Sequence, residues 1–103
     1  MAIPRGGTPT HIFDLPFDTT DIVKGARITY AQNDIQILCK ETEDCKITEN
    51  AIITELTQDE TFLFDDDIPV QIQLEILDFN NKVHPSDIIT KSAKKLLNKE
   101  VFE

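Results

Sequence analysis

Apolar and polar residues alternate along most of the chain, which is typical of β-strands that bury one face. The clearest example is Val70–Leu77, where Val, Ile and Leu alternate with Gln and Glu as far as Ile76. Other segments show weaker alternation and are mostly bounded by Gly, Pro, Asn or Asp. We therefore predict further strands over Thr8–Leu15, Gly25–Gln32, Ile35–Lys40, Cys45–Thr48, Ala51–Leu56 and Lys82–Ala93.

A tight hairpin is predicted where the second and third of these strands meet. Only Asn33-Asp34 separates them, and both residue types tolerate the positive φ angles of a two-residue turn. Counting back from that turn places Tyr30 opposite Ile37 and Ile28 opposite Cys39. All four side chains then share one face, so we expect Cys39 to be buried.

Two segments depart from the alternating pattern. Thr57-Gln58-Asp59-Glu60 matches a helix capping box, and it predicts one short helical turn near Thr57–Phe62 that covers an end of the fold. Pro85 cannot donate to a strand ladder, so the strand from Lys82 should be bulged or lie at an edge near its start. For residues 92–103 we favour a strand to Ala93 followed by a loop, over a short helix capped by Ser92.

About seven short strands, with turn signals roughly every ten residues, favour an antiparallel sandwich over units with long helical crossovers. We therefore predict an all-β fold, an immunoglobulin-like antiparallel β-sandwich. At 103 residues the chain fits one domain, 1–103. Residues 1–9 hold Pro4, Pro9 and Gly6-Gly7, and they predict an extended, loosely tethered N-terminal arm.

Charge and hydropathy exclude several classes of protein. The net charge is −9, and the Lys and Arg clusters that neutralise nucleic-acid phosphates are missing. No segment reaches the roughly 18 apolar residues of a membrane span, and the N-terminus lacks the layout of a secretion signal. We expect a soluble, cytoplasmic protein. Residues 82–103 carry five basic and three acidic groups, so head-to-tail pairing between copies is an alternative to a simply solvated surface.

Candidate chemistry is sparse. Cys39 and Cys45 are too few for a structural zinc site, and we expect reduced thiols, with a local disulfide as the alternative. His11 and His84 belong to no motif. Asp65–Asp67 offers carboxylates for calcium, but without the spacing of an EF-hand loop, and a solvated turn is favoured. We therefore predict no catalytic, cofactor-binding or metal-binding residues, and no enzyme activity.

Several stretches together resemble a family of small structural proteins encoded in the morphogenesis regions of phages and prophages of low-GC Gram-positive bacteria. They are Pro4–Thr10, Leu56–Thr61 with Phe64, Val70–Leu74 and Ser86–Ile88. The resemblance spans nearly the whole chain. It implies a compact β-sandwich without catalysis, located in the bacterial host cytoplasm or in the virion.

The expected function is accordingly that of a phage or prophage structural or assembly protein that acts through protein–protein contacts. Its partners would be other phage structural proteins or a further copy of itself, and neither nucleic acid nor membrane. The alternative is a freestanding ligand-binding module for carbohydrate or calcium, which would use the loops Phe64–Ile68 and Asp78–Lys82. Sugar binding is disfavoured because the chain has no Trp and a single Tyr.

Overall fold

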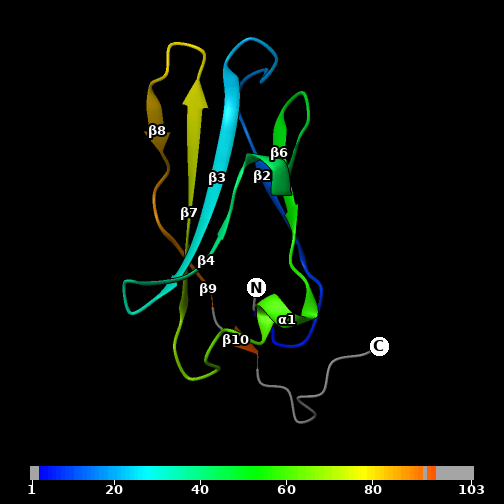
Figure 1. The fold of residues 1–103 in the computed structure, drawn as a ribbon, viewed down its shortest axis with the longest axis vertical. Coiled ribbons are helices and arrows are strands. Elements are labelled where there is room, and N and C mark those ends of the chain that lie inside the picture. Colours follow the sequence, from blue (N-terminus) through cyan, green and yellow to red (C-terminus); the bar gives the residue numbers. More distant parts are fainter. Residues whose placement is uncertain (1–2, 92, 95–103) are drawn as a thin grey trace.

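The computed structural model describes residues 3–91 and 93–94. Strands dominate it, and the helical content of this part is one 3-10 turn and one α-helical turn (Figure 1). In chain order the elements are β1 (Ile3–Pro4), β2 (Thr10–Asp14), β3 (Val23–Gln32), β4 (Ile35–Lys40), the 3-10 turn η1 (Thr42–Asp44), β5 (Cys45–Ile47), β6 (Ala51–Glu55), α1 (Gln58–Thr61), β7 (Val70–Asp78), β8 (Val83–Pro85), β9 (Ile89–Lys91) and β10 (Ala93–Lys94).

The strands form two facing sheets and one small pair. One sheet has the order β2-β6-β5, and the other has the order β4-β3-β7-β8, with β9 also pairing with β7. Every pairing within these two sheets is antiparallel. The third unit is the parallel pair of β1 and β10. The predicted all-β antiparallel sandwich is confirmed.

The core lies between the two sheets and is organised by β3 and β7, the two longest strands. Both strands alternate buried and more exposed residues, as the sequence pattern predicts. Ile28 faces Leu74, and Tyr30 faces Ile72, across the ladder between them. On the side of the other sheet, the core contains Ile52 of β6 and Leu56, the residue that follows β6. Burying such side chains contributes about 1.5–3 kcal/mol each to stability.

The predicted hairpin is present, but the predicted register is wrong. Asn33 and Asp34 have φ angles of 52° and 63°, as a two-residue turn with two positive φ angles requires. A bulge between Tyr30 and Ala31 then shifts the pairing by one residue, so that Tyr30 faces Leu38 and Ile28 faces Lys40. Because side chains alternate between faces, this single step exchanges the inward and outward residues of β4.

The predicted helical turn is confirmed as α1. The Thr57 hydroxyl accepts a hydrogen bond from the Glu60 backbone N–H at 3.2 Å, and the Glu60 carboxylate accepts one from the Thr57 N–H at 2.8 Å. This reciprocal pair is the capping box that the sequence indicates. Thr61 at the end of the turn is buried, and Phe64 after it lies in the core beside Tyr30. The centroids of the Phe64 and Tyr30 rings are 5.9 Å apart.

The N-terminal segment differs from the expected loosely tethered arm. Ile3 is only 1% exposed and belongs to the core, and the strand it begins pairs with β10. Gly6 has a φ angle of 77°, which favours glycine, and its N–H donates to the Thr61 hydroxyl at 2.9 Å. That hydroxyl in turn donates to the Gly7 carbonyl at 3.0 Å. Residues 3–7 are therefore packed into the domain.

The predicted strand after Asn80-Asn81 is broken near Pro85. It forms two short pieces, β8 and β9, on the same side of β7. Between them the Ser86 backbone N–H donates to the Leu74 carbonyl at 2.7 Å, which keeps the interrupted edge attached. The predicted strand runs to Ala93 as one element, but Ala93 begins the separate strand β10, which pairs in parallel with β1. The question of loop or helix beyond this strand falls on residues that lie outside the described part.

Candidate functional site

An apolar groove of about 440 Å³ opens along the side of the sandwich, between β2 of one sheet and β9 of the other. Its apolar lining comes from β1, from β2 and the residue after it, from β7 and from β9: Ile3, Ile12, Phe13, Leu15, Ile72, Leu74 and Ile89. Asp14 and Lys91 add charge at its rim. A sandwich without a strand closing this side leaves its core accessible there, which is why a groove forms.

The outer edge of β2 presents unpaired backbone groups beside this groove. On the side of β6, the Pro9 carbonyl accepts from the Leu56 N–H at 3.0 Å, and the Leu15 N–H donates to the Asn50 carbonyl at 2.8 Å. In an antiparallel ladder such residues alternate with residues that turn their N–H and C=O away. Thr10, Ile12 and Asp14 are the alternate residues of β2, so their backbone groups point to the open edge. No partner for them is seen within the described part of the chain.

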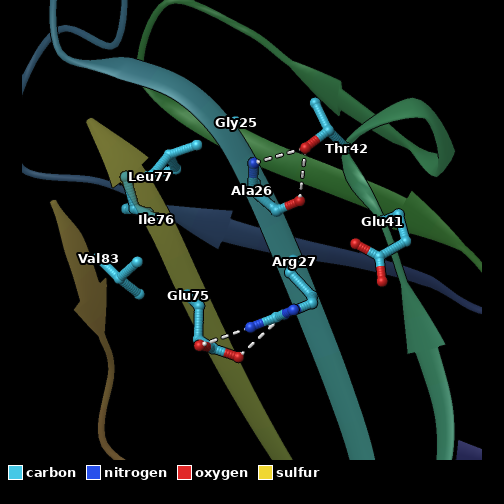
Figure 2. A pocket seen from close by; sticks show the side chains of 9 residues that line it. All are labelled: Gly25, Ala26, Arg27, Glu41, Thr42, Glu75, Ile76, Leu77 and Val83. Carbon is cyan, nitrogen blue, oxygen red and sulfur yellow. Dashed lines mark hydrogen bonds and ion pairs between the residues drawn. The ribbon is translucent and has the colours of Figure 1, made fainter. Parts of the chain in front are cut away.

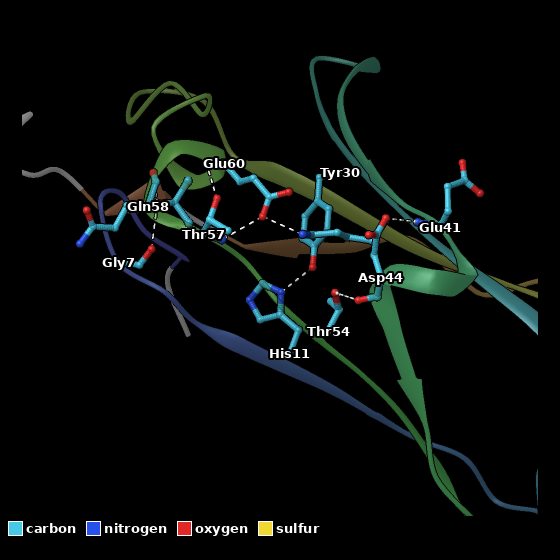
Figure 3. Close-up of polar contacts among 11 residues, drawn as sticks. Gly7, His11, Tyr30, Glu41, Asp44, Thr54, Thr57, Gln58 and Glu60 are labelled. Atoms are coloured by element: carbon cyan, nitrogen blue, oxygen red, sulfur yellow. Dashed lines mark hydrogen bonds and ion pairs between the residues drawn. The ribbon is translucent and has the colours of Figure 1, made fainter. Parts of the chain in front are cut away.

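His11 lies on the inner face of the same strand and is tied to the core. Its Nδ1 lies 2.6 Å from the hydroxyl of Tyr30, which is fully buried (Figure 3). Burial lowers the pKa of His11, and the positive charge of Lys91 lowers it further. Burial likewise raises the pKa of Tyr30 far above its ordinary value. A neutral His11 whose Nδ1 accepts a hydrogen bond from the Tyr30 hydroxyl is therefore the stable arrangement.

This pairing predicts a pH dependence of stability. Because the pKa of His11 is lower in the folded than in the unfolded state, the unfolded chain binds its proton more readily. The contribution of His11 is complete above about pH 6.5 and is lost as the pH falls below it towards the folded pKa. Urea unfolding between about pH 7 and pH 5 should show the free energy of unfolding falling. His11→Gln should flatten that slope, and an unchanged slope would contradict this assignment.

Cys39 does not occupy the buried position that we expected. The β4 register shift places it opposite Thr29 on the outer face, where it is half-buried and its thiol lies 3.4 Å from the Glu41 carboxylate. Cys45 is the cysteine that packs against the core, opposite the buried Thr54. Both are free thiols. Burial raises both pKa values, and Glu41 raises that of Cys39 further.

We predict that a thiol reagent modifies Cys39 before Cys45 in the native protein. Cys39 faces outward from β4, whereas the partly buried Cys45 packs against the core. Both should react more slowly than in urea, because the thiolate is the reactive form and burial disfavours it. Peptide mapping after timed alkylation separates the two sites. Modification of Cys45 first would contradict the observed register of β4.

The residue that takes the inward place on β4 is Lys40. Its ammonium group contacts the Glu60 carboxylate at 2.7 Å, and its side chain is 9% exposed. Burial alone would raise the pKa of Glu60, but hydrogen bonds from Lys40 and from the Thr57 N–H outweigh it and lower that pKa. One carboxylate thus both caps α1 and neutralises a buried cation of the opposite sheet. The sequence predicts the capping box, whereas no sequence pattern indicates the ion pair between Lys40 and Glu60.

A second, smaller hollow of about 210 Å³ lies over Gly25 and Ala26, and its polar groups bind one another (Figure 2). The Thr42 hydroxyl accepts from the Ala26 N–H at 3.1 Å and donates to the Ala26 carbonyl at 3.0 Å. Arg27 and Glu75 form a two-point ion pair at 3.2 and 3.1 Å across it. A Cβ on Gly25 would lie 2.8 Å from the Thr42 oxygen, so glycine allows the close approach. These contacts are structural.

The acidic loop Asp65–Asp67 brings three carboxylate oxygens within 4.8 Å of one another. Asp66 contacts Arg5 at 3.8 Å, and Asp65 accepts from the Asp67 N–H at 2.8 Å. The loop is held from below by the buried Gln32, whose amide donates to two loop carbonyls and accepts from the Asp65 N–H. The carboxylates of Asp65 and Asp66 therefore have protein partners.

The other loop proposed for ligands, Asp78–Lys82, is also held by its own contacts. The Asp78 carboxylate accepts from the backbone N–H groups of Asn80 and Lys82 at 2.8 and 2.9 Å. His84 lies 2.8 Å from its other oxygen. Hydrogen bonding from His84 and then from the loop backbone lowers the pKa of Asp78. His11 and His84 thus belong to separate contacts, and the structure brings neither of them to a cysteine.

No known family model matches the chain, and neither does any curated protein sequence. A solved structure with a similar fold is a strand-swapped dimer of the immunoglobulin-like domain of mouse leukocyte-associated immunoglobulin-like receptor 1. The superposition has a TM-score of 0.53 and covers 92% of this chain and 88% of the receptor chain, at 12% identity. The fold is immunoglobulin-like. At this level of identity the likeness concerns the fold alone.

The immunoglobulin-like arrangement explains why the groove is open. Constant-type domains pair four strands in one sheet and three in the other, and the first strand of the chain borders the larger sheet. In the described part of this chain, the sheet of β2 has three strands, and β1 pairs with β10 instead. The edge of β2 is consequently uncovered.

No helix in the described residues is long and apolar enough to cross a membrane.

Proposed function

We propose that this protein works by associating with other protein chains and turns over no substrate, as a structural or assembly component of a phage or prophage particle. The observation that carries the proposal is the free edge of β2 beside an apolar groove. An exposed strand edge can be completed by a strand of another chain, whose backbone supplies the missing hydrogen bonds. In that role the protein acts in the bacterial host cytoplasm or in the virion.

Two further features support association over chemistry. In the smaller hollow Arg27 binds Glu75 and Thr42 binds the Ala26 backbone, and in the two candidate loops Asp65 and Asp78 accept from the loop backbone. The groove beside β2 is instead mainly apolar. The receptor domain that shares the fold is described as a strand-swapped dimer, so strand-mediated association is compatible with this architecture. The contact surface proposed is β2 rather than the segment expected to serve as a free arm, because Ile3 of that segment is buried in the core and Gly6 and Gly7 bind Thr61.

The proposal is tested by measuring association directly. The full chain should sediment as more than a monomer, or should bind a purified product of a neighbouring gene in surface plasmon resonance. Both measurements are repeated at low and high salt. A protein that stays monomeric and binds none of the neighbouring gene products would overturn the proposal. Saturable binding of Ca²⁺ or of an oligosaccharide by such a monomer would then favour the ligand-binding module.

A further inference from the structure

Free strand edges in natural sheets usually carry features that prevent pairing with another chain, such as lysines, prolines, bulges or very short strands. Most edges of this sandwich have such a feature. β4 is bulged and carries Lys40, β5 has three residues including Lys46, β8 ends in Pro85, and β9 has three residues including Lys91. These edges are poor templates for another strand.

The edge of β2 lacks these features. Its five residues, Thr-His-Ile-Phe-Asp, include no lysine and no proline, and its pairing with β6 runs without a bulge. Ile12 lies at its centre and is 60% exposed. In the described part of the chain, β2 is therefore the edge best suited to receive another strand. Pro9 and Pro16 flank it and limit the strand that can pair there to about the same length.

We propose that β2 pairs with β2 of a second copy, antiparallel, around a two-fold axis at Ile12. This inference rests on the proposed function of association and names the partner. The two three-stranded sheets would join into one continuous sheet, three strands from each copy. A two-fold contact uses the same patch on both subunits, so the patch must be complementary to itself.

The sequence of β2 meets that condition. With Ile12 on the axis, Ile12 faces its copy, and Thr10 of each chain faces Asp14 of the other. Thr10, Ile12 and Asp14 are the residues whose backbone groups point to the open edge, so each facing pair exchanges two backbone hydrogen bonds. On the outer face the two Ile12 side chains cover each other, and the Thr10 hydroxyl can donate to the Asp14 carboxylate.

The inner face of the joined sheet supports the same register. There His11 of one copy lies beside Phe13 of the other, and both residues line the groove. The partner strand thereby shields the groove wall of Ile72 and Leu74 from water, which is favourable because apolar surface is removed from solvent. The free backbone groups of β2 would form the hydrogen bonds between the copies, and the adjoining groove would supply the apolar burial that stabilises the dimer.

Charge makes a distinguishing prediction. Two copies carry a net charge of −9 each and repel at long range, while β2 itself contributes a single acidic side chain. Salt screens that repulsion, so association through β2 should be tighter at about 0.5 M than at about 0.05 M salt. Head-to-tail pairing of the lysine-rich segment with the acidic body would show the opposite dependence.

The test is sedimentation equilibrium of the full chain between about 1 µM and 1 mM. The wild-type protein should be a reversible dimer. Ile12→Lys places a charge on the axis opposite its own copy, and it should raise the dimer dissociation constant by about tenfold or more. The matched control is Ile35→Lys on the edge strand β4, where the isoleucine is 66% exposed, and it should dimerise like the wild type. Circular dichroism confirms that both variants fold.

The outcomes separate this inference from the proposed function. A dimer unaffected by Ile12→Lys, or one weakened equally by Ile35→Lys, overturns pairing through β2 but leaves association in place. A monomer that binds the product of a neighbouring gene likewise overturns pairing through β2 and leaves the proposed association in place. A monomer without partners overturns both. A spin label at Ile12→Cys, in a chain with Cys39→Ser and Cys45→Ala, should show strong dipolar broadening, and its absence in a dimer would exclude the two-fold axis at Ile12.

Discussion

Replacing Phe64 with alanine is expected to lower the free energy of unfolding by about 3–5 kcal/mol, the usual cost of truncating a buried aromatic side chain. Phe64 is 1% exposed and packs against Tyr30 in the core. It enters from the segment that follows α1, and alanine in its place would leave a cavity beside Tyr30. With a total stability of about 5–15 kcal/mol for a domain of this kind, such a loss would leave the variant marginally folded.

The neighbouring residue provides the control. Leu63 is 54% exposed, and Leu63→Ala should change the free energy of unfolding by no more than about 0.5 kcal/mol. Chemical denaturation followed by circular dichroism measures both variants under the same conditions. Equal losses would show that the turn after α1 does not anchor the core through Phe64 alone.

Removing the carboxylate of Glu60 is expected to have the second large effect. Glu60→Gln leaves the ammonium of Lys40 nearly buried without its counter-ion, which typically costs about 3–5 kcal/mol when the pair is fully buried. The Glu60 side chain is partly exposed, so we expect about 3 kcal/mol. Glutamine can still accept the hydrogen bond from the Thr57 N–H, so the cap of α1 is retained and the loss isolates the ion pair.

A double-mutant cycle separates the charge from the packing. Lys40→Met removes the buried cation and leaves Glu60 solvated, so it should cost less than Glu60→Gln. The combined variant should recover most of the stability lost in Glu60→Gln, because neither charge remains without a partner. Denaturation midpoints of the four proteins decide the point. A double variant less stable than Glu60→Gln would mean that the pair stabilises the fold by its own attraction.

The parts of the fold that local sequence signals determine were predicted correctly. Strict alternation locates β7, the Asn33-Asp34 pair locates the hairpin turn, and the capping box locates α1. Each signal is read within about ten residues and acts through local backbone chemistry. The β4 register failed because a bulge leaves the turn sequence unchanged and is decided by what the strand meets across the sandwich.

The candidate site depends on contacts that the sequence pattern does not encode. The strand that begins with Ile3, β1, pairs with β10, and this pairing holds Ile3 in the core. Because β1 pairs there, it does not cover the edge of β2. Both facts join segments that are far apart in the chain. Lys40 is buried because a carboxylate from α1 reaches it. Alternation places a residue on a face, but it does not show which edge of the finished sheet remains uncovered.

The parallel pairing of β1 with β10 also determines how the domain would respond to tension. The two strands run in the same direction, so pulling the chain before Ile3 and beyond Lys94 slides one strand along the other. The bonds between them are then loaded together in shear, whereas opening a hairpin such as β3–β4 from its free ends breaks one pair at a time. Ile3 must leave the core in the same step. This short joint would therefore bear a tensile load before β3 and β7 do.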